Sequence, residues 1–158
     1  MVTGPIQQPS VAPPAVRPPA ARRPSPPSPP AGDLPALARA LAVPPGEPRW
    51  RERVIVHLTP VRRGFAEHVR ITEGPAGLYA EVLAQAPRLH RGVRLLTREH
   101  AAIVAALADL QRAVERPGVC AEELRRRIDD LLRALSRHRQ RGADLLWQAY
   151  QTDLGGET

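Results

Sequence analysis

Three histidines occupy positions where a helical core would normally carry aliphatic side chains. His68, His100 and His138 each follow apolar residues at steps of three and four, which places them on one face of a helix. Neutral imidazole is the commonest nitrogen ligand in proteins, and it binds iron, zinc or copper. Helical bundles build metal sites from inward-facing side chains on separate helices. The pattern therefore predicts a metal centre inside a bundle, with iron or zinc as the ion.

The alternative is a layer of histidines that hydrogen-bond to one another without a metal, because buried polar groups need partners. Geometry separates the two hypotheses. A metal centre requires the three imidazoles to converge within about 5 Å of a common point, since the ligand bonds are about 2.0–2.1 Å long. The midpoint between His100 and His138 falls at residue 119, beside a Pro117-Gly118 turn. An antiparallel hairpin would bring these two histidines to the same height.

Three long helices are predicted from the apolar spacing. Each has one face whose members recur every three or four residues. The first face is Trp50, Val54, Leu58, Val61, Phe65, His68 and Thr72; the second is Leu89, Val93, Leu96, His100, Ile103, Leu107, Leu110 and Val114; the third is Leu124, Ile128, Leu131, Leu135, His138, Gly142, Leu145 and Ala149. Pro60 either kinks the first helix or marks its beginning, with Thr59 as the N-cap.

The predicted fold is all-α, an up-down four-helix bundle of three long helices and one short helix over 76–86. We place the bundle at residues 48–154. Residues 1–47 differ in composition, because fifteen of the 19 prolines lie between Pro5 and Pro48. Such a segment buries too little apolar surface to fold, so we predict a disordered, Pro-rich tail with one short helix over 34–43.

Composition narrows the functional classes. All 23 basic residues are arginines, which a GC-rich coding bias explains, so the net charge of +7 is weak evidence for a polyanionic partner. Arginine clusters on the last helix are interleaved with Asp129 and Asp130, as on a solvated, salt-bridged face. There is no recognition helix and no set of stacking aromatic residues. We therefore expect no specific binding of nucleic acid.

Other features of the chain indicate a cytoplasmic protein. Cys120 is the only cysteine, which excludes a disulfide framework and a thiolate metal cage. No segment approaches the ~20 apolar residues of a membrane span, and prolines interrupt the N-terminus where a signal peptide would need an apolar core. A protein partner or a homodimer remains open. No set of residues identifies an enzymatic reaction.

Several segments resemble those of hemerythrin-like domains, the HHE cation-binding family. The likeness covers about residues 50–150. The segments that carry it are Glu67 to Glu73 with Leu78-Tyr79, which resemble "His…Glu…Leu-Tyr-Pro"; Glu99-His100-Ala101-Ala102-Ile103, which resembles "Glu-His…Ile"; and His138 with Asp144-Leu145-Leu146, which resembles the last helix. The resemblance implies a four-helix bundle that holds iron, commonly an oxygen-bridged pair of irons, for storage or for sensing oxygen or redox state.

The chain departs from this family at several ligand positions. Four residues after His68, where the family has a carboxylate, stands Thr72, and Glu73 follows one residue later. Asp144 is six residues after His138, more than the single turn that the family uses. A single ion held by the three histidines therefore fits the sequence better than two ions do. Glu73 and Asp144 are the second-choice ligands.

Two functional hypotheses follow. The first is a hemerythrin-like bundle that binds iron or zinc through its core histidines and senses a small molecule or a redox state. The second is a metal-free helical module that acts through contacts with other proteins or regulates them. The two hypotheses differ in what the core histidines do.

Overall fold

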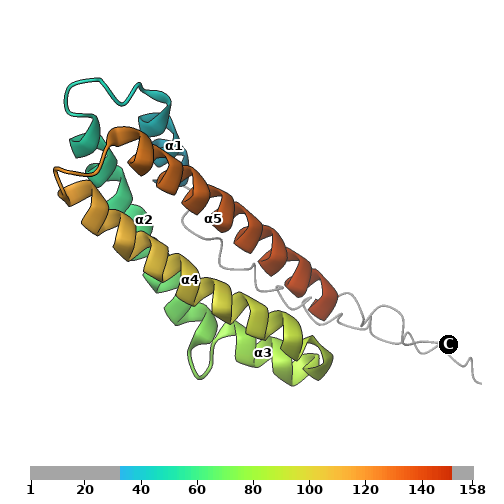
Figure 1. The fold of residues 1–158 in the computed structure, drawn as a ribbon. Coiled ribbons are helices and arrows are strands. Elements are labelled where there is room, and N and C mark those ends of the chain that lie inside the picture. The colour runs from blue at the N-terminus through green and yellow to red at the C-terminus, as the bar shows by residue number, and fades with distance from the viewer. Residues whose placement is uncertain (1–32, 151–158) are drawn as a thin grey trace, which may run out of the picture.

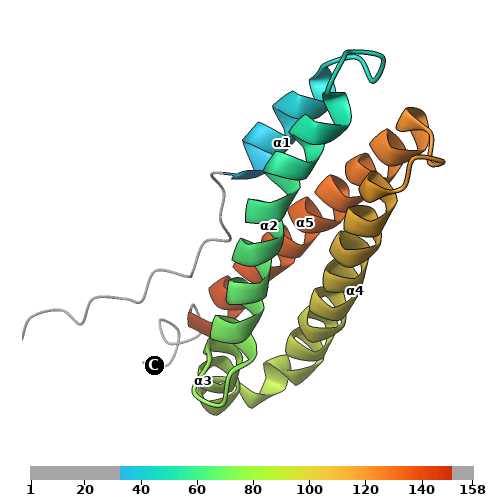
Figure 2. The ribbon, with the colours of Figure 1, turned by 90° about the vertical axis from the view of Figure 1, so that its left-hand side faces the viewer.

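The computed structural model describes residues 33–150 of the chain, and all regular structure in this range is helical. The fold is an all-α bundle with short loops (Figure 1). Its elements are α1 (Asp33–Ala42), α2 (Trp50–Glu73), α3 (Leu78–Gln85), a 3₁₀ turn (Pro87–Leu89), α4 (His90–Glu115) and α5 (Ala121–Tyr150). Helix α4 runs antiparallel to α2 and to α5 (Figure 2). The predicted class and the three long helices are confirmed.

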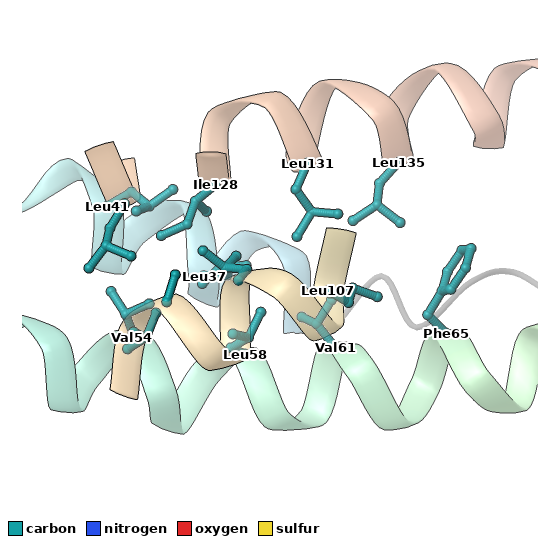
Figure 3. Packing of buried hydrophobic residues seen from close by; sticks show 14 of the residues in the cluster. Leu37, Leu41, Val54, Leu58, Val61, Phe65, Leu107, Ile128, Leu131 and Leu135 are labelled. Carbon is teal, nitrogen blue, oxygen red and sulfur yellow. The ribbon is translucent and has the colours of Figure 1, made fainter. Parts of the chain in front are cut away.

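The three predicted apolar faces form the core of the bundle. Every member of the face on α4 is buried, and so is every member of the face on α2 except His68, which is partly buried. On α5 only Gly142 is partly exposed. Leucine, valine and isoleucine side chains from α2, α4 and α5 pack together with Leu37 and Leu41 of α1 (Figure 3). Burial of these aliphatic faces is the main stabilising contribution to the fold.

Helix α2 passes through Pro60 without interruption. The prolyl nitrogen has no hydrogen to donate, so the carbonyl one turn earlier lacks its usual partner inside the helix. The hydroxyl of Thr59 donates to the carbonyl of Ile55 at 3.2 Å, which satisfies one acceptor of the same turn. Of the two alternatives for Pro60, the structure shows the continuous helix. Continuity matters because it fixes the rotation of His68 relative to the residues near Trp50.

The two short helices lie at opposite ends of the bundle (Figures 1 and 2). The predicted helix at 34–43 is confirmed as α1, which packs against α2 and buries Leu37 and Leu41 in the core. The packed structure thus includes residues ahead of 48, where we placed the start of the bundle. Helix α3 packs against α2 and α5 at the other end. The predicted disordered tail lies, for residues 1–32, outside the described residues, as do residues 151–158.

No helix within the described range 33–150 combines the length and the apolar character that a membrane span needs. The long helices are amphipathic, with charged side chains paired along their outer faces. These pairs are three or four residues apart and largely exposed to solvent, which screens them, so each contributes little to stability.

Arg51 fixes the hairpin between α4 and α5. Its guanidinium group donates to the carbonyls of Val114 at 3.3 Å and Arg116 at 3.1 Å, and also to the carbonyl of Val119. These carbonyls belong to the end of α4 and to the turn that follows, where backbone acceptors have no helical partner. A positive charge at a helix C-terminus is also favoured by the helix dipole. Arg51 therefore ties α2 to the turn that sets the register of α4 against α5.

We predict that Arg51→Met lowers the free energy of unfolding by about 2 kcal/mol, because several charged hydrogen bonds are lost together while the apolar stem is kept. Urea unfolding followed by circular dichroism measures this. Arg62→Met, on the exposed side of the same helix, is the matched control and should change stability by less than about 0.5 kcal/mol. Equal losses in the two variants would contradict the anchoring role of Arg51.

Candidate metal centre

A layer of three histidines divides the core into two parts. On the side of α1 lies a hydrophobic cluster that includes Phe65 and Leu135. On the side of α3 lies a second cluster that includes Tyr79 and Leu145. The histidines continue the same helical faces, so they are buried by the packing that buries their aliphatic neighbours. Placing three imidazoles in this position costs desolvation free energy and requires partners for their nitrogens.

The Nε2 atoms of the three histidines converge. His68 comes from α2, His100 from α4 and His138 from α5. The Nε2 atoms of His68 and His138 are 3.3 Å apart, and those of His100 and His138 are 3.0 Å apart. One ring nitrogen from each histidine lies within 4.8 Å of the others. The convergence expected of a metal centre is met, and His100 and His138 lie at the same height of the hairpin, as predicted.

Carboxylates hold the outer nitrogens of two of these rings. Nδ1 of His100 is 2.5 Å from Oε1 of Glu73, at the end of α2. Nδ1 of His138 is 3.1 Å from Oε2 of Glu99, on α4. Glu99 is paired in turn with Arg141, one turn after His138. A carboxylate accepts only, so each Nδ1 carries the hydrogen and each Nε2 presents its lone pair to the centre of the layer.

His68 differs from the other two histidines. It is partly buried, whereas His100 is 1% exposed and His138 is 4% exposed. Its Nδ1 has no hydrogen-bond partner among the described residues. The layer therefore contains two imidazoles whose outer nitrogens are held by carboxylates and one, His68, whose outer nitrogen is not.

Aromatic rings close the layer from both sides. The ring of Phe65 lies 5.7, 5.6 and 5.8 Å, centroid to centroid, from His68, His100 and His138. On the other side Tyr79, from α3, stacks on His100 with the ring planes 12° apart. Its Oη lies 3.3 Å from Nε2 of His100. Phe65 and Tyr79 thus separate the polar layer from water along the bundle axis.

The turn before α3 brings Tyr79 into place. Gly77 stands so close to the end of α2 that a Cβ at this position would lie 2.6 Å from the carbonyl oxygen of Thr72. Glycine is required for this approach, since any side chain would force the two segments apart. Tyr79 follows two residues later, in the first turn of α3.

Burial lowers the pKa of all three histidines. For His68 the pKa falls to about 4, chiefly through desolvation and then through repulsion from His100 and His138. Desolvation also lowers the pKa of His138 and of His100, where the hydrogen bond to Glu73 opposes the effect. Burial, with the nearby charge of Glu73, raises the pKa of the Tyr79 phenol. At neutral pH the histidines are therefore uncharged, which is the form that binds metal.

The two second-choice ligands lie apart from the converging nitrogens. Glu73 contacts the outer nitrogen of His100, so it orients a ligand rather than joining the cluster. Asp144 is on the exposed side of α5, where its carboxylate accepts from the amide of Gln140 at 2.9 Å. Six residues correspond to about 600° of helix rotation, which directs Asp144 away from the face of His138.

Three residues of the site were not predicted from the sequence in these roles: Phe65, Tyr79 and Glu99. Phe65 precedes His68 by three positions on the same face, and Glu99 immediately precedes His100, so both were near a predicted ligand. Their orientation depends on how neighbouring helices approach, which spacing within one helix does not reveal. The signal for Tyr79 was an aromatic residue on the inner face of a short helix.

The distances match those of a four-coordinate ion. Bonds of about 2.0–2.1 Å to zinc place two ligand atoms of a tetrahedron about 3.3 Å apart. The Nε2 separations of the His68–His138 and His100–His138 pairs, 3.3 and 3.0 Å, lie close to that value. Without a cation, lone pairs on neighbouring Nε2 atoms would face and repel one another at this short distance, unless a proton lay between them. The donor set, three neutral imidazoles with two carboxylates behind them, suits a divalent transition metal.

Comparison of the chain with known protein families, curated proteins and solved structures gives no match. A functional conclusion for this chain therefore rests on the geometry of its histidine layer.

Proposed function

We propose that this bundle is a metal-binding protein that holds one iron or zinc ion through Nε2 of His68, His100 and His138. The observation that carries the proposal is the convergence of these nitrogens inside an otherwise apolar core, where Nε2 of His138 lies 3.3 Å from that of His68 and 3.0 Å from that of His100, and one ring nitrogen of each histidine lies within 4.8 Å of the others. The carboxylates of Glu73 and Glu99 support it, because they fix the tautomer that presents Nε2. Their negative charge also offsets the charge of a divalent cation.

The proposed centre is mononuclear. Among the described residues the group able to hold an ion consists of the three histidines alone, with no carboxylate that could bridge a second metal. We propose that the resemblance to hemerythrin-like domains reflects a common arrangement in which separate helices each contribute an inward histidine. A bound iron ion would supply a reversible one-electron change or a site for a small molecule. Redox or small-molecule sensing is therefore the role that we propose.

Metal analysis of the purified full-length chain tests the proposal. We expect one equivalent of iron or zinc per chain after loading, and less than a tenth of an equivalent in the triple variant His68→Ala, His100→Ala, His138→Ala. The matched control replaces His57 and His90, which lie outside the layer, and should keep the full equivalent. A triple Gln variant, which keeps polar side chains of similar length, separates loss of ligands from loss of folding.

The contrary result is substoichiometric metal in the natural sequence that does not change in the triple variant. That result would leave the metal-free interaction module as the function, with the histidines as a hydrogen-bonded layer.

A further inference from the structure

Tyr79 is the one polar side chain of the layer to which the three-histidine centre assigns no role. It is 8% exposed, and its hydroxyl enters the histidine layer rather than solvent. The sequence offers no structural reason for a hydroxyl here, because Tyr79 otherwise belongs to a cluster of aliphatic residues. A buried hydroxyl requires a hydrogen-bond partner or another polar contact.

In the absence of an ion, this hydroxyl contacts Nε2 of His100 and also the side chain of Thr72. Its Oη and Nε2 of His100 are 3.3 Å apart. Nδ1 of His100 donates to Glu73, so Nε2 is an acceptor and the tyrosine donates to it. A metal bound at Nε2 uses the same lone pair. The hydroxyl then loses the acceptor on His100 while it remains beside the ion.

The distance between Oη of Tyr79 and Nε2 of His100 indicates what the hydroxyl oxygen binds once an ion is present. Two ligand atoms of a tetrahedral ion lie about 3.3 Å apart when the bonds are about 2.0–2.1 Å long. Oη of Tyr79 and Nε2 of His100 are separated by 3.3 Å, as are the Nε2 atoms of His68 and His138. The phenol oxygen thus lies as far from Nε2 of His100 as Nε2 of His68 lies from Nε2 of His138.

We propose that Tyr79 is the fourth protein ligand of this centre and completes a three-nitrogen, one-oxygen site as a phenolate. This inference rests on the proposed metal-binding function. On binding, the O–H bond of Tyr79 breaks, its proton passes to water, and the oxygen forms a bond to the ion without any change of oxidation state. The anionic oxygen, with the carboxylates of Glu73 and Glu99 behind two histidines, favours a trivalent over a divalent ion.

The assignment gives the short helix a function. Helix α3 is only eight residues long, and Gly77 allows it to lie against the end of α2. Through Tyr79 it closes the coordination of an ion that the three long helices hold from the side. Ferric iron is the species that such a site stabilises, which makes the redox state of iron the signal most directly linked to the position of α3.

The test compares three full-length proteins: the natural sequence, Tyr79→Phe, and the matched control Tyr150→Phe, which removes the second tyrosine near the end of α5. Each protein is loaded with one equivalent of ferrous iron under argon, freed of unbound iron by gel filtration, and then oxidised by exposure to air. Ferric iron bound to a phenolate absorbs visible light by charge transfer, whereas ferric iron bound only to imidazoles lacks this band.

We expect the visible band in the natural protein and in Tyr150→Phe, and its absence in Tyr79→Phe. Zinc titrations of the same proteins should show at least a tenfold weaker affinity for Tyr79→Phe, with binding of one equivalent retained. Circular dichroism verifies that Tyr79→Phe, which changes one atom in the core, keeps its helices.

Two results would overturn the inference alone: histidine-dependent iron binding without a visible band, or a band that persists in Tyr79→Phe. If no protein binds metal through its histidines, the metal-binding function itself is wrong, and the role of Tyr79 is excluded with it. The metal content of the natural protein distinguishes the two failures.

Discussion

Zinc should raise the free energy of unfolding of the metal-free protein by about 4 kcal/mol when the free ion reaches about a thousand times its dissociation constant. The three histidines that we propose as ligands come from α2, α4 and α5, and they converge only when these helices pack together. The unfolded chain has no such site, so nearly all of the binding free energy stabilises the folded state. For a bundle of this size the expected rise in Tm is on the order of 10–20 °C.

Thermal unfolding followed at 222 nm, with and without zinc, measures this effect. The triple alanine variant of the histidines should show no gain, and the variant that lacks His57 and His90 should gain as much as the natural protein. Magnesium should have no effect on any of them, because it requires oxygen ligands in octahedral geometry. A zinc-dependent gain of equal size in the triple variant would show that the stabilising ion binds elsewhere.

The architecture could be predicted because burial of an entire helical face leaves a strong periodic signal. The apolar face on α4 has eight members, spaced three or four residues apart, and all eight are buried. The contribution of α1 to the core could not be predicted in the same way. Ten residues flanked by prolines show that a helix is favoured, yet the packing of Leu37 and Leu41 against α2 depends on the loop that returns the chain.

The three core histidines could also be predicted from the sequence, since each interrupts an aliphatic face. The equal height of His100 and His138 followed from the position of the turn at Pro117-Gly118. The surroundings of these rings were less accessible. Whether Glu73 approaches the ion or the outer nitrogen of His100 depends on the rotation of α2 against α4, and spacing within one helix does not determine that rotation.

Tyr79 illustrates the same restriction on inference from sequence. Its helix is short, and its place over the histidines depends on the close approach of Gly77 to the end of α2. The resemblance to hemerythrin-like domains drew attention to the Leu78-Tyr79 pair without indicating that the hydroxyl enters the layer. Tertiary contacts between a loop and a helix end decide this, and they become visible only in the folded structure.

Acid should destabilise the metal-free protein, with the loss beginning near pH 6.5 and continuing to about pH 4. Desolvation lowers the pKa of His68, His100 and His138 in the folded state. Below the ordinary histidine pKa of 6.5 the unfolded chain therefore binds more protons than the folded chain does, and stability falls as the pH falls. The full stabilisation is present above pH 6.5. The loss that comes from His68 continues until the pH reaches about 4, where its pKa in the folded state lies.

Urea unfolding between pH 4 and pH 8, in the presence of a chelator, measures this dependence. His68→Gln should flatten the profile, because its side chain does not titrate, and it should leave a smaller slope from His100 and His138. His90→Gln, at an exposed position on α4, is the matched control and should keep the profile of the natural protein. Zinc should raise the free energy of unfolding most above pH 6.5 and progressively less below it, because protons compete with the ion for the same nitrogens. An unchanged slope in His68→Gln would assign the acid sensitivity to groups outside the histidine layer.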